Sequence, residues 1–316
     1  MDDLRNELKS MFTSYWMYLT VNAACKLNLF DLIKSGKDSF LKLKNTMNAD
    51  KVSLKLLLDA LVYMEFIEYK GGLYFLNEKS YYLTDDHEFS LKNACVLWGM
   101  EHMDAWQLLD ENIITGKPVF DNYFQYLSDK PGKLENYHKA MYEYAVEDYK
   151  DITKVIDFSK YNFIMDVGGG LGALITNIKK TYPYKRCTLF EMPEVIDLVN
   201  DNDIELIGGD FFTEVPESPD CIILSRVIHD WEDSKANLIL KNCYDALQPD
   251  GHLIIIENFV DEIDDKASLL SLNMRLICKS YERSKEEYLK LLSANGFKFV
   301  YQKKLNKLQN ILIVSK

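Results

Sequence analysis

The chain has no excess of positive charge and no long apolar segment. Its 316 residues include 37 lysines and arginines against 49 aspartates and glutamates, which gives a net charge of -12. Such a surface repels nucleic-acid phosphates and anionic membranes. No apolar stretch approaches a bilayer-spanning length, and the charged N-terminus, MDDLRNELKS, lacks the apolar core of a signal peptide. We therefore expect a cytoplasmic protein that binds neither nucleic acid nor membrane and whose ligand is small and neutral or cationic.

Metal-binding and disulfide patterns are also missing. The six cysteines show no CxxC spacing, and the chain has no HxxxH pair. Several of the cysteines lie within apolar, strand-like runs, which is typical of reduced cysteines in a cytosolic core. We expect neither a disulfide framework nor a metal site. The six are Cys25, Cys95, Cys187, Cys221, Cys243 and Cys278.

Residues 1–90 have the apolar spacing of a helical region. Val21, Ala24 and Cys25 recur at helical intervals, and the stretch 54–62 repeats the pattern. The segment FIEYKGGLYFLN (66–77) then alternates around two glycines and predicts a β-hairpin. Two helices followed by a hairpin are the winged-helix pattern.

Many winged helices bind DNA, so that function needs weighing. The lysines between residues 34 and 70 are nearly balanced by acids in the same stretch, whereas a helix that contacts phosphates needs a clear positive excess. We therefore favour a structural use of this region. Its apolar N-terminal segment, MFTSYWMYLTVNAACKL, carries more apolar surface than one small domain easily covers, which predicts a homodimer.

Residues 91–150 are expected to form further helices, interrupted at TGKP and DKPG. Their large apolar side chains include Phe120 and Met141. Such residues usually belong to a core. A helical linker between two domains can also line a cleft, and methionines beside aromatic rings suit a flat apolar ligand.

Residues 151–316 alternate short apolar runs with helix-length segments. Runs such as FIMDV, RCTLFE, CIILSR and HLIIIE are typical of parallel strands that are buried on both faces. The last two runs, FKFVYQ and NILIVS, are separated by only a few polar residues, so the final strand must be antiparallel. The expected fold is a Rossmann-like, doubly wound α/β domain with a mostly parallel seven-stranded sheet.

The first strand of this domain ends in a glycine-rich corner, MDVGGGLGALITNI (165–178). Ligands of doubly wound sheets bind beyond the carboxyl ends of the strands, where glycines allow a close approach of the backbone. We assign Asp166, Gly168 and Gly170 to cofactor binding. The corner alone also fits a dinucleotide pattern or a purely structural turn.

Acids at the next two strand ends favour a nucleoside. Glu191 follows the glycines by about twenty residues, where a carboxylate accepts ribose hydroxyls. Asp210 follows the third strand and can accept from an adenine amino group, with Phe211 beside it to pack on the ring. NAD and S-adenosylmethionine share these features. A pyrophosphate needs basic neighbours, which are missing before Lys179, so the sulfonium of S-adenosylmethionine fits better.

Taken in order, several motifs resemble a known family. DVGGGLG, LFEMPEVI, GDFF, LSRVIHDWED, LQPDGHLIIIEN and YERSKEEYLKLLSANGF are similar to motifs of S-adenosylmethionine-dependent O-methyltransferases. The resemblance is to the plant caffeate and acetylserotonin type and its bacterial antibiotic-pathway relatives. It covers nearly the whole chain, because the winged-helix region and TGKPVFDNYFQYL resemble that family's dimerisation half.

The histidine in HDW is the candidate general base. His229 follows the fourth strand and so emerges at the same sheet edge as the glycines, where a neutral imidazole can deprotonate a hydroxyl. The resemblance implies that Glu257 and Glu282 brace its ring. Ser225 and Arg226 are expected near the adenosine.

One departure from the family concerns the acceptor. In NMRLICKSYERS, relatives commonly have an apolar residue after NM, where this chain has Arg275. Asn273 and Arg275 are assigned to substrate binding, together with Phe120 and Met141. Arg275 either meets an anionic group of the substrate or pairs elsewhere, and the sequence leaves both open.

The predicted activity is methyl transfer from S-adenosylmethionine to a hydroxyl of a small aromatic metabolite, within secondary metabolism. Three alternatives stay open: a carbon or nitrogen acceptor on the same scaffold, a nicotinamide oxidoreductase, and a winged-helix regulator. The expected domains are a winged-helix dimerisation domain (1–90), a helical linker (91–150) and the catalytic domain (151–316).

Overall fold

The computed structural model describes residues 2–216, 218–260 and 265–316. They form two compact units, Met1–Met103 and Asp104–Lys316. The expected helical segment 91–150 is therefore divided between the units. No helix among the described residues has the length and apolar character needed to cross a membrane.

The first unit is built from helices and one hairpin. Its hairpin pairs β1 (Ile67–Lys70) with β2 (Leu73–Leu76) in antiparallel register, as the alternating pattern around the two glycines predicts. The helices α4 and α5 precede the hairpin, and the Asp50 carboxylate caps α5 by accepting from the Ser53 N–H at 2.8 Å. The helices are α1 (Asp2–Phe12), α2 (Tyr15–Lys26), α3 (Leu29–Lys34), α4 (Phe40–Met47), α5 (Lys51–Tyr63), α6 (Glu78–Tyr81) and α7 (Lys92–Trp98).

The second unit begins with helices, since α8 (Glu101–Trp106) crosses the boundary between the units. Then follow α9 (Leu109–Thr115), α10 (Tyr123–Ser128), α11 (Pro131–Asp148) and α12 (Ile152–Val155). Pro131 occupies the first turn of α11, where the missing N–H costs nothing.

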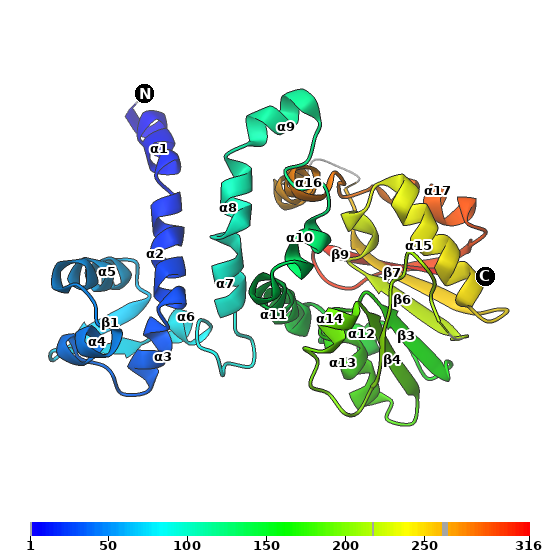
Figure 1. Ribbon diagram of the computed structural model, residues 1–316, viewed down its shortest axis with the longest axis horizontal. Helices are drawn as coiled ribbons and strands as arrows, with labels where there is room; N and C mark the ends of the chain where they lie inside the picture. The colour runs from blue at the N-terminus through cyan, green and yellow to red at the C-terminus, as the bar shows by residue number, and fades with distance from the viewer. Residues whose placement is uncertain (1, 217, 261–264) are drawn as a thin grey trace. The chain divides into compact units, whose positions relative to one another are not determined.

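A seven-stranded sheet forms the centre of the second unit, with the order β5-β4-β3-β6-β7-β9-β8 (Figure 1). The strands are β3 (Phe163–Val167), β4 (Arg186–Glu191), β5 (Glu205–Gly208), β6 (Cys221–Ser225), β7 (His252–Asn258), β8 (Lys298–Lys304) and β9 (Gln309–Ser315). β9 runs antiparallel to both of its neighbours, and the pairs from β5 through β7 are parallel. The predicted sheet and its antiparallel final strand are confirmed.

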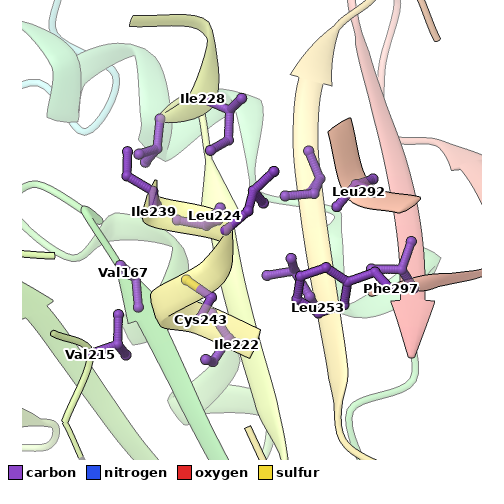
Figure 2. Packing of buried hydrophobic residues seen from close by; sticks show 14 of the residues in the cluster. Val167, Val215, Ile222, Leu224, Ile228, Ile239, Cys243, Leu253, Leu292 and Phe297 are labelled. Carbon is purple, nitrogen blue, oxygen red and sulfur yellow. The ribbon is translucent and has the colours of Figure 1, made fainter. Parts of the chain in front are cut away.

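Helices cover both faces of the sheet. On one face, α15 (Asp233–Ala246) and α17 (Lys285–Ala294) pack against β6 and β7 (Figure 2). On the other face, α12 and α13 (Ala173–Thr181) pack on alternate residues of the same strands. α17 begins with the capping box that Ser284 and Glu287 predict. The remaining helices are α14 (Pro193–Ile196) and α16 (Asp265–Cys278).

The central strands end side by side because they are parallel and in register. Asp166 of β3 pairs with Ile223 of β6, and Ser225 of β6 pairs with Ile256 of β7. The turns after these strands therefore start at one edge of the sheet, which is where doubly wound folds bind their ligands.

Candidate active site

The glycine corner directly follows β3. Gly168, Gly170 and Gly172 all have positive φ, the conformation that side chains disfavour. The Gly168 N–H donates to the Phe190 carbonyl at 2.8 Å, which holds the turn against β4. A Cβ at Gly168 would lie 2.9 Å from Cγ2 of Val227, so this corner directly contacts the turn that follows β6.

Two buried acids lie beneath and beside the corner. Neither carboxylate oxygen of Asp166 has a hydrogen-bond partner among the described residues. Glu191 accepts from the Gly170 N–H at 3.0 Å and from the Met192 N–H at 2.8 Å. Burial raises the pKa of each carboxyl to about 7, and the charge of Glu191 adds to the shift at Asp166. The corner therefore holds negative charge that lacks a cationic partner.

Asp210 and Phe211 follow β5 in the turn that begins after Gly208. Asp210 is exposed, and its carboxylate accepts from the Phe212 N–H at 2.8 Å, so it also shapes its own turn. The Phe211 ring lies 3.4 Å from where a Cβ of Gly168 would be. This places an aromatic ring at the glycine corner.

Ser225 and Arg226 end β6. Ser225 Oγ hydrogen-bonds to the hydroxyl of Tyr149 at 2.6 Å, and both side chains are buried. Arg226 has a positive φ of 56°, which turns the chain sharply at the sheet edge. Its Nε lies 3.5 Å from Nε2 of His229, and its Nη2 lies 4.0 Å from Oε1 of Glu282.

His229 lies in the short 3-10 helix η1 (Ile228–Asp230). The residues before it, Val227 and Ile228, are buried in the core shared with α15, and Figure 2 shows Ile228 at the edge of that cluster. His229 itself is buried, and its Nδ1 lies 2.8 Å from Oε1 of Glu282. With Nδ1–H donating to this carboxylate, Nε2 is left as the basic nitrogen.

Glu257 contacts the backbone of the histidine turn. Its Oε1 accepts from the N–H groups of Val227 at 3.1 Å, Ile228 at 3.0 Å and His229 at 3.3 Å. These are the N–H groups that a short helix leaves unsatisfied at its start. The expectation that Glu257 braces the ring is thus refined, because the contacts of this acid are to the main chain that carries the ring.

The charges around His229 determine its protonation. Burial is the largest influence on His229 and lowers its pKa, but the carboxylates of Glu282, Asp230 and Glu257 together outweigh it and raise the pKa to about 9. Burial also disfavours the charged form of Glu282, yet His229 and Arg226 hold the pKa of Glu282 below its ordinary value. The surrounding carboxylates thus favour the protonated imidazole, whereas Arg226, whose Nε–H points to Nε2 at 3.5 Å, opposes it.

Ligand atoms of His229, Glu257 and Glu282 lie within 4.8 Å of one another, a spacing that could hold a metal ion. Nδ1 of His229 is already bonded to Glu282, however, and Oε1 of Glu257 is engaged by three backbone N–H groups. The donor set suits a hydrogen-bonded base better than a metal centre.

A cavity of about 610 Å³ adjoins the histidine turn. Asp230 and Trp231 line it from the turn, and Phe120, Tyr123 and Phe124 line it from the segment around α10. Oδ1 of the lining residue Asp230 lies 3.6 Å from Nε2 of His229, while His229 itself does not line this cavity.

The other predicted substrate residues do not line this cavity. Asn273 is buried and accepts from Nε1 of Trp106 at 2.9 Å. Arg275 donates from Nη1 to the Lys279 carbonyl at 3.2 Å, and its Nη2 lies 3.3 Å from where a Cβ of Gly116 would be. Met141 is half-buried on α11.

Comparison with known proteins identifies the family. A model of the O-methyltransferase domain matches residues 105–298. The chain belongs to this O-methyltransferase family. The match covers most of the second unit, including the glycine corner and the turn that carries His229.

Relatives and solved structures agree with this assignment. Phenazine O-methyltransferase PhzM of Lysobacter antibioticus is 28% identical over 310 residues, which cover 93% of this chain and 91% of that protein. Phenazine-1-carboxylate N-methyltransferase of Pseudomonas aeruginosa is also 28% identical, with 92% and 91% coverage. The crystal structure of human N-acetylserotonin methyltransferase in complex with SAM has a TM-score of 0.90 at 26% identity, covering 100% of this chain and 98% of that one.

Two side chains of this methyltransferase site are not predicted by the sequence patterns. Tyr149, the partner of Ser225, lies at the end of α11, and no spacing rule links it to β6. Arg283 is almost fully buried beneath the histidine turn and donates to the Ile228 carbonyl at 2.9 Å. Arg283 lies next to Glu282 in the YERS motif, and its sequence position alone does not indicate which carbonyl groups it contacts.

The contact between the two turns predicts how Gly168→Ala behaves. We expect the variant to lose more stability than Gly170→Ala, by about 1 kcal/mol or more, because both introduce a side chain at positive φ but only the methyl group at position 168 would collide with Val227. A Cβ at Gly170 would have its nearest neighbour at an ordinary 3.5 Å, which makes Gly170→Ala the matched control. Urea denaturation measures the difference. Equal losses would contradict a tight contact between the corner and the turn.

Proposed function

We propose that this protein is an S-adenosylmethionine-dependent O-methyltransferase that acts on a hydroxyl of a small aromatic metabolite, with His229 as general base. The observation that carries the proposal is the contact of Gly168 with Val227. This contact brings a nucleoside-type glycine corner against the turn of a buried histidine, and the next residues of that turn, Asp230 and Trp231, line a cavity with aromatic side chains.

The residues at the corner fit a cationic nucleoside. Asp166 has two buried carboxylate oxygens that find no hydrogen-bond partner within the described part of the chain, and Glu191 ends β4, where ribose hydroxyls are accepted. The glycines leave space that a Cβ would fill. No lysine or arginine occurs in the stretch 165–178, which suits a sulfonium better than a pyrophosphate. We therefore assign S-adenosylmethionine to Asp166, Gly168, Gly170, Glu191, Asp210 and Phe211, with Ser225 and Arg226 at its border.

The mechanism requires a proton acceptor and alignment. When bound, S-adenosylmethionine supplies a methyl carbon whose bond to sulfur breaks as a bond to the acceptor oxygen forms, leaving a neutral thioether. His229 takes the hydroxyl proton on Nε2, while Nδ1–H stays bonded to Glu282. The proton that occupies Nε2 before the reaction is lost more easily when positive charge at the neighbouring glycine corner lowers the pKa of the imidazole. Glu257 fixes the turn, so the ring is aligned before the reaction begins.

The cavity beside the histidine turn supports an aromatic acceptor. Rings of Phe120, Tyr123, Phe124 and Trp231 contribute to its lining beside charged residues such as Lys117 and Lys235, and these rings suit a flat ligand with polar substituents. Of the proposed substrate residues, Phe120 contributes directly to this wall, and Met141, Asn273 and Arg275 stay proposals. Arg275 bonds the Lys279 carbonyl and lies outside the lining of this cavity, so its contact with an anionic substituent stays a proposal.

A nitrogen acceptor is the second candidate. It is favoured by the likeness to phenazine-1-carboxylate N-methyltransferase, which is as similar to this chain as the phenazine O-methyltransferase. A buried imidazole base is needed for a hydroxyl but not for a nitrogen that already holds a free lone pair. The contribution of His229 to turnover therefore separates the two.

For the first unit we propose a winged-helix domain that forms a cytoplasmic homodimer. Helices α1 and α2 expose large apolar side chains to an extent unusual for a monomer surface. A second copy of the chain would cover them. The exposed residues are Leu4, Leu8, Met11, Phe12, Trp16 and Met17.

The dimer is tested by substituting two of these side chains. We expect wild-type protein to sediment as a dimer at micromolar concentration, and Phe12→Asp/Trp16→Asp to sediment as a folded monomer, because charges oppose burial of that face. Ile114→Asp is the control, since Ile114 is also exposed but lies on α9. A monomeric wild type would contradict the dimer.

The general base is tested by His229→Asn. We expect turnover with S-adenosylmethionine and a panel of phenols and hydroxybenzoates to fall by about 10²- to 10⁴-fold, with cofactor affinity unchanged. His252→Asn is the control, because His252 opens β7 away from the turn. Wild-type kcat should also rise with pH toward about 9, since the pKa of His229 is raised and only the neutral ring accepts a proton. Unchanged turnover of these hydroxyl acceptors in the variant would contradict the role of His229 as general base.

The acids at the corner predict a pH-dependent affinity. Because burial raises the pKa of Asp166 and of Glu191 to about 7, these carboxyls are largely protonated at pH 6 and ionised at pH 8. A cation favours the ionised forms, so the affinity for S-adenosylmethionine should rise about tenfold between pH 6 and pH 8. Isothermal titration calorimetry measures this rise.

Two further ligands serve as controls in that titration. Neutral S-adenosylhomocysteine should bind with a smaller rise in affinity, because it lacks the sulfonium. NADH should not bind. An affinity for S-adenosylmethionine that falls as the pH increases, or binding of NADH alone, would contradict the cofactor assignment.

A further inference from the structure

We propose that Arg283 is a positioning residue that fixes the carbonyl end of the histidine turn and thereby holds His229 against Glu282. The inference rests on the proposed role of His229 as the base. Arg283 does not contact the imidazole, and it bonds the cavity-lining residue Trp231 through the main-chain carbonyl, so it acts on His229 through the backbone.

The contacts of Arg283 surround the end of the turn. Nη1 donates to the Ile228 carbonyl at 2.9 Å, and Nη2 donates to the Trp231 carbonyl at 2.6 Å. Nη2 and Nε also donate to Oδ1 of Asp233 at 2.8 and 3.1 Å. With 1% of its surface exposed, Arg283 is among the largest fully buried side chains of the described chain.

The turn is thus held at both ends by groups of opposite charge. Glu257 accepts from the N–H groups at its start, and Arg283 donates to the carbonyl of Ile228, its first residue, and to the carbonyl of Trp231, the residue after it. This arrangement matches the dipole of a helical turn, positive at its N–H end and negative at its carbonyl end. Within the turn, the Ile228 carbonyl accepts from the Trp231 N–H at 3.2 Å, and Arg283 adds a second, charged donor to that carbonyl.

The sequence position of Arg283 links its contacts with the turn to the contact that orients His229. The neighbouring residue Glu282 supplies the carboxylate bonded to Nδ1 of His229, and Ser280 adds a 3.0 Å hydrogen bond to the Trp231 carbonyl. One short segment therefore holds both the ring and the backbone on either side of it. The 2.8 Å bond between His229 and Glu282 depends on this fixed spacing.

Arginine suits this role better than lysine. The planar guanidinium presents its donors in a fixed fork, so one side chain reaches two carbonyls and a carboxylate at once. A lysine at the same position keeps the positive charge but cannot span the same acceptors. Arg283→Lys therefore removes the geometry and preserves the electrostatics.

A purely structural role would rest on the pair with Asp233 at the start of α15. The Asp233 side chain is 65% exposed, so that pair is partly screened by water. Asp233→Asn removes the ion pair but leaves the two carbonyl contacts in place. It is the matched control for Arg283→Lys.

The readout is the pKa of His229, measured by NMR titration of protein labelled with ¹⁵N-histidine, with the resonance assigned by its loss in His229→Asn. Asp230, Arg226, Glu257 and Glu282 all face the ring and are unchanged in these variants. We expect the pKa of wild-type His229 to lie near 9 and that of Arg283→Lys to move toward 6.5, because the bond to Glu282 is loosened. Asp233→Asn should leave the pKa of His229 unchanged.

Calorimetric titration with S-adenosylmethionine and thermal melts accompany each variant. Arg283→Lys should keep the cofactor affinity and lose at least tenfold in kcat, since a displaced base loses alignment. If Arg283→Lys fails to fold, Ser280→Ala provides the test, because it removes one bond to the same carbonyl and should lower the pKa of His229 by a smaller amount.

The inference is overturned if Arg283→Lys, or in its place Ser280→Ala, leaves the pKa of His229 at its wild-type value, or if Asp233→Asn lowers that pKa equally. These outcomes are separate from failure of the proposed function. Absence of cofactor binding and of methyl transfer in the wild type would refute the function, while the NMR titration still decides how Arg283 acts on His229.

Discussion

The buried hydrogen bond between Nδ1 of His229 and Oε1 of Glu282 is the interaction on which the site depends. Both groups are removed from water, where a charged imidazole or carboxylate is costly unless it is paired. The two residues are 53 positions apart in the chain, so the pair forms only when the segment before α17 packs on the turn after β6. His229 is therefore paired with Glu282 only after the chain has folded.

The backbone of the histidine turn sets a second constraint. A sheet edge must end in loops, and a loop buried beside a ligand site leaves polar groups that water cannot reach. Glu257 meets this need at the end of β7, an inner strand where a lone carboxylate would otherwise be unfavourable. The same acid thus satisfies the turn and contributes to the negative field around His229.

Periodicity accounts for how much of this structure could be predicted from the sequence. Apolar runs such as FIMDV and HLIIIE become inner strands because only extended segments buried on both faces need so many consecutive apolar residues. Strand ends then bring Asp166, Glu191 and His229 to one edge. This inference needs no knowledge of side-chain contacts.

Long side chains limit such predictions. Arg283 and Glu257 reach backbone groups many residues away, and the identity of their targets depends on how loops pack. Tyr149 similarly finds Ser225 from another helix. Arg275 follows the same rule, since its guanidinium extends along its own helix to Lys279 and does not enter the described cavity. A residue type indicates what a side chain can bind, but its target is fixed by tertiary structure.

The folding free energy of the glycine corner also depends on where the tertiary structure places its side chains. The unpartnered oxygens of Asp166 and the raised pKa of Glu191 both cost folding free energy above pH 7, because two acids are held in a dry place without a cation. A core selected only for stability would carry apolar side chains there. The cost becomes useful when a cation arrives, because the protein has already removed water from the acids and fixed them in place. The fold therefore determines the affinity of this corner for positive charge before the ligand binds.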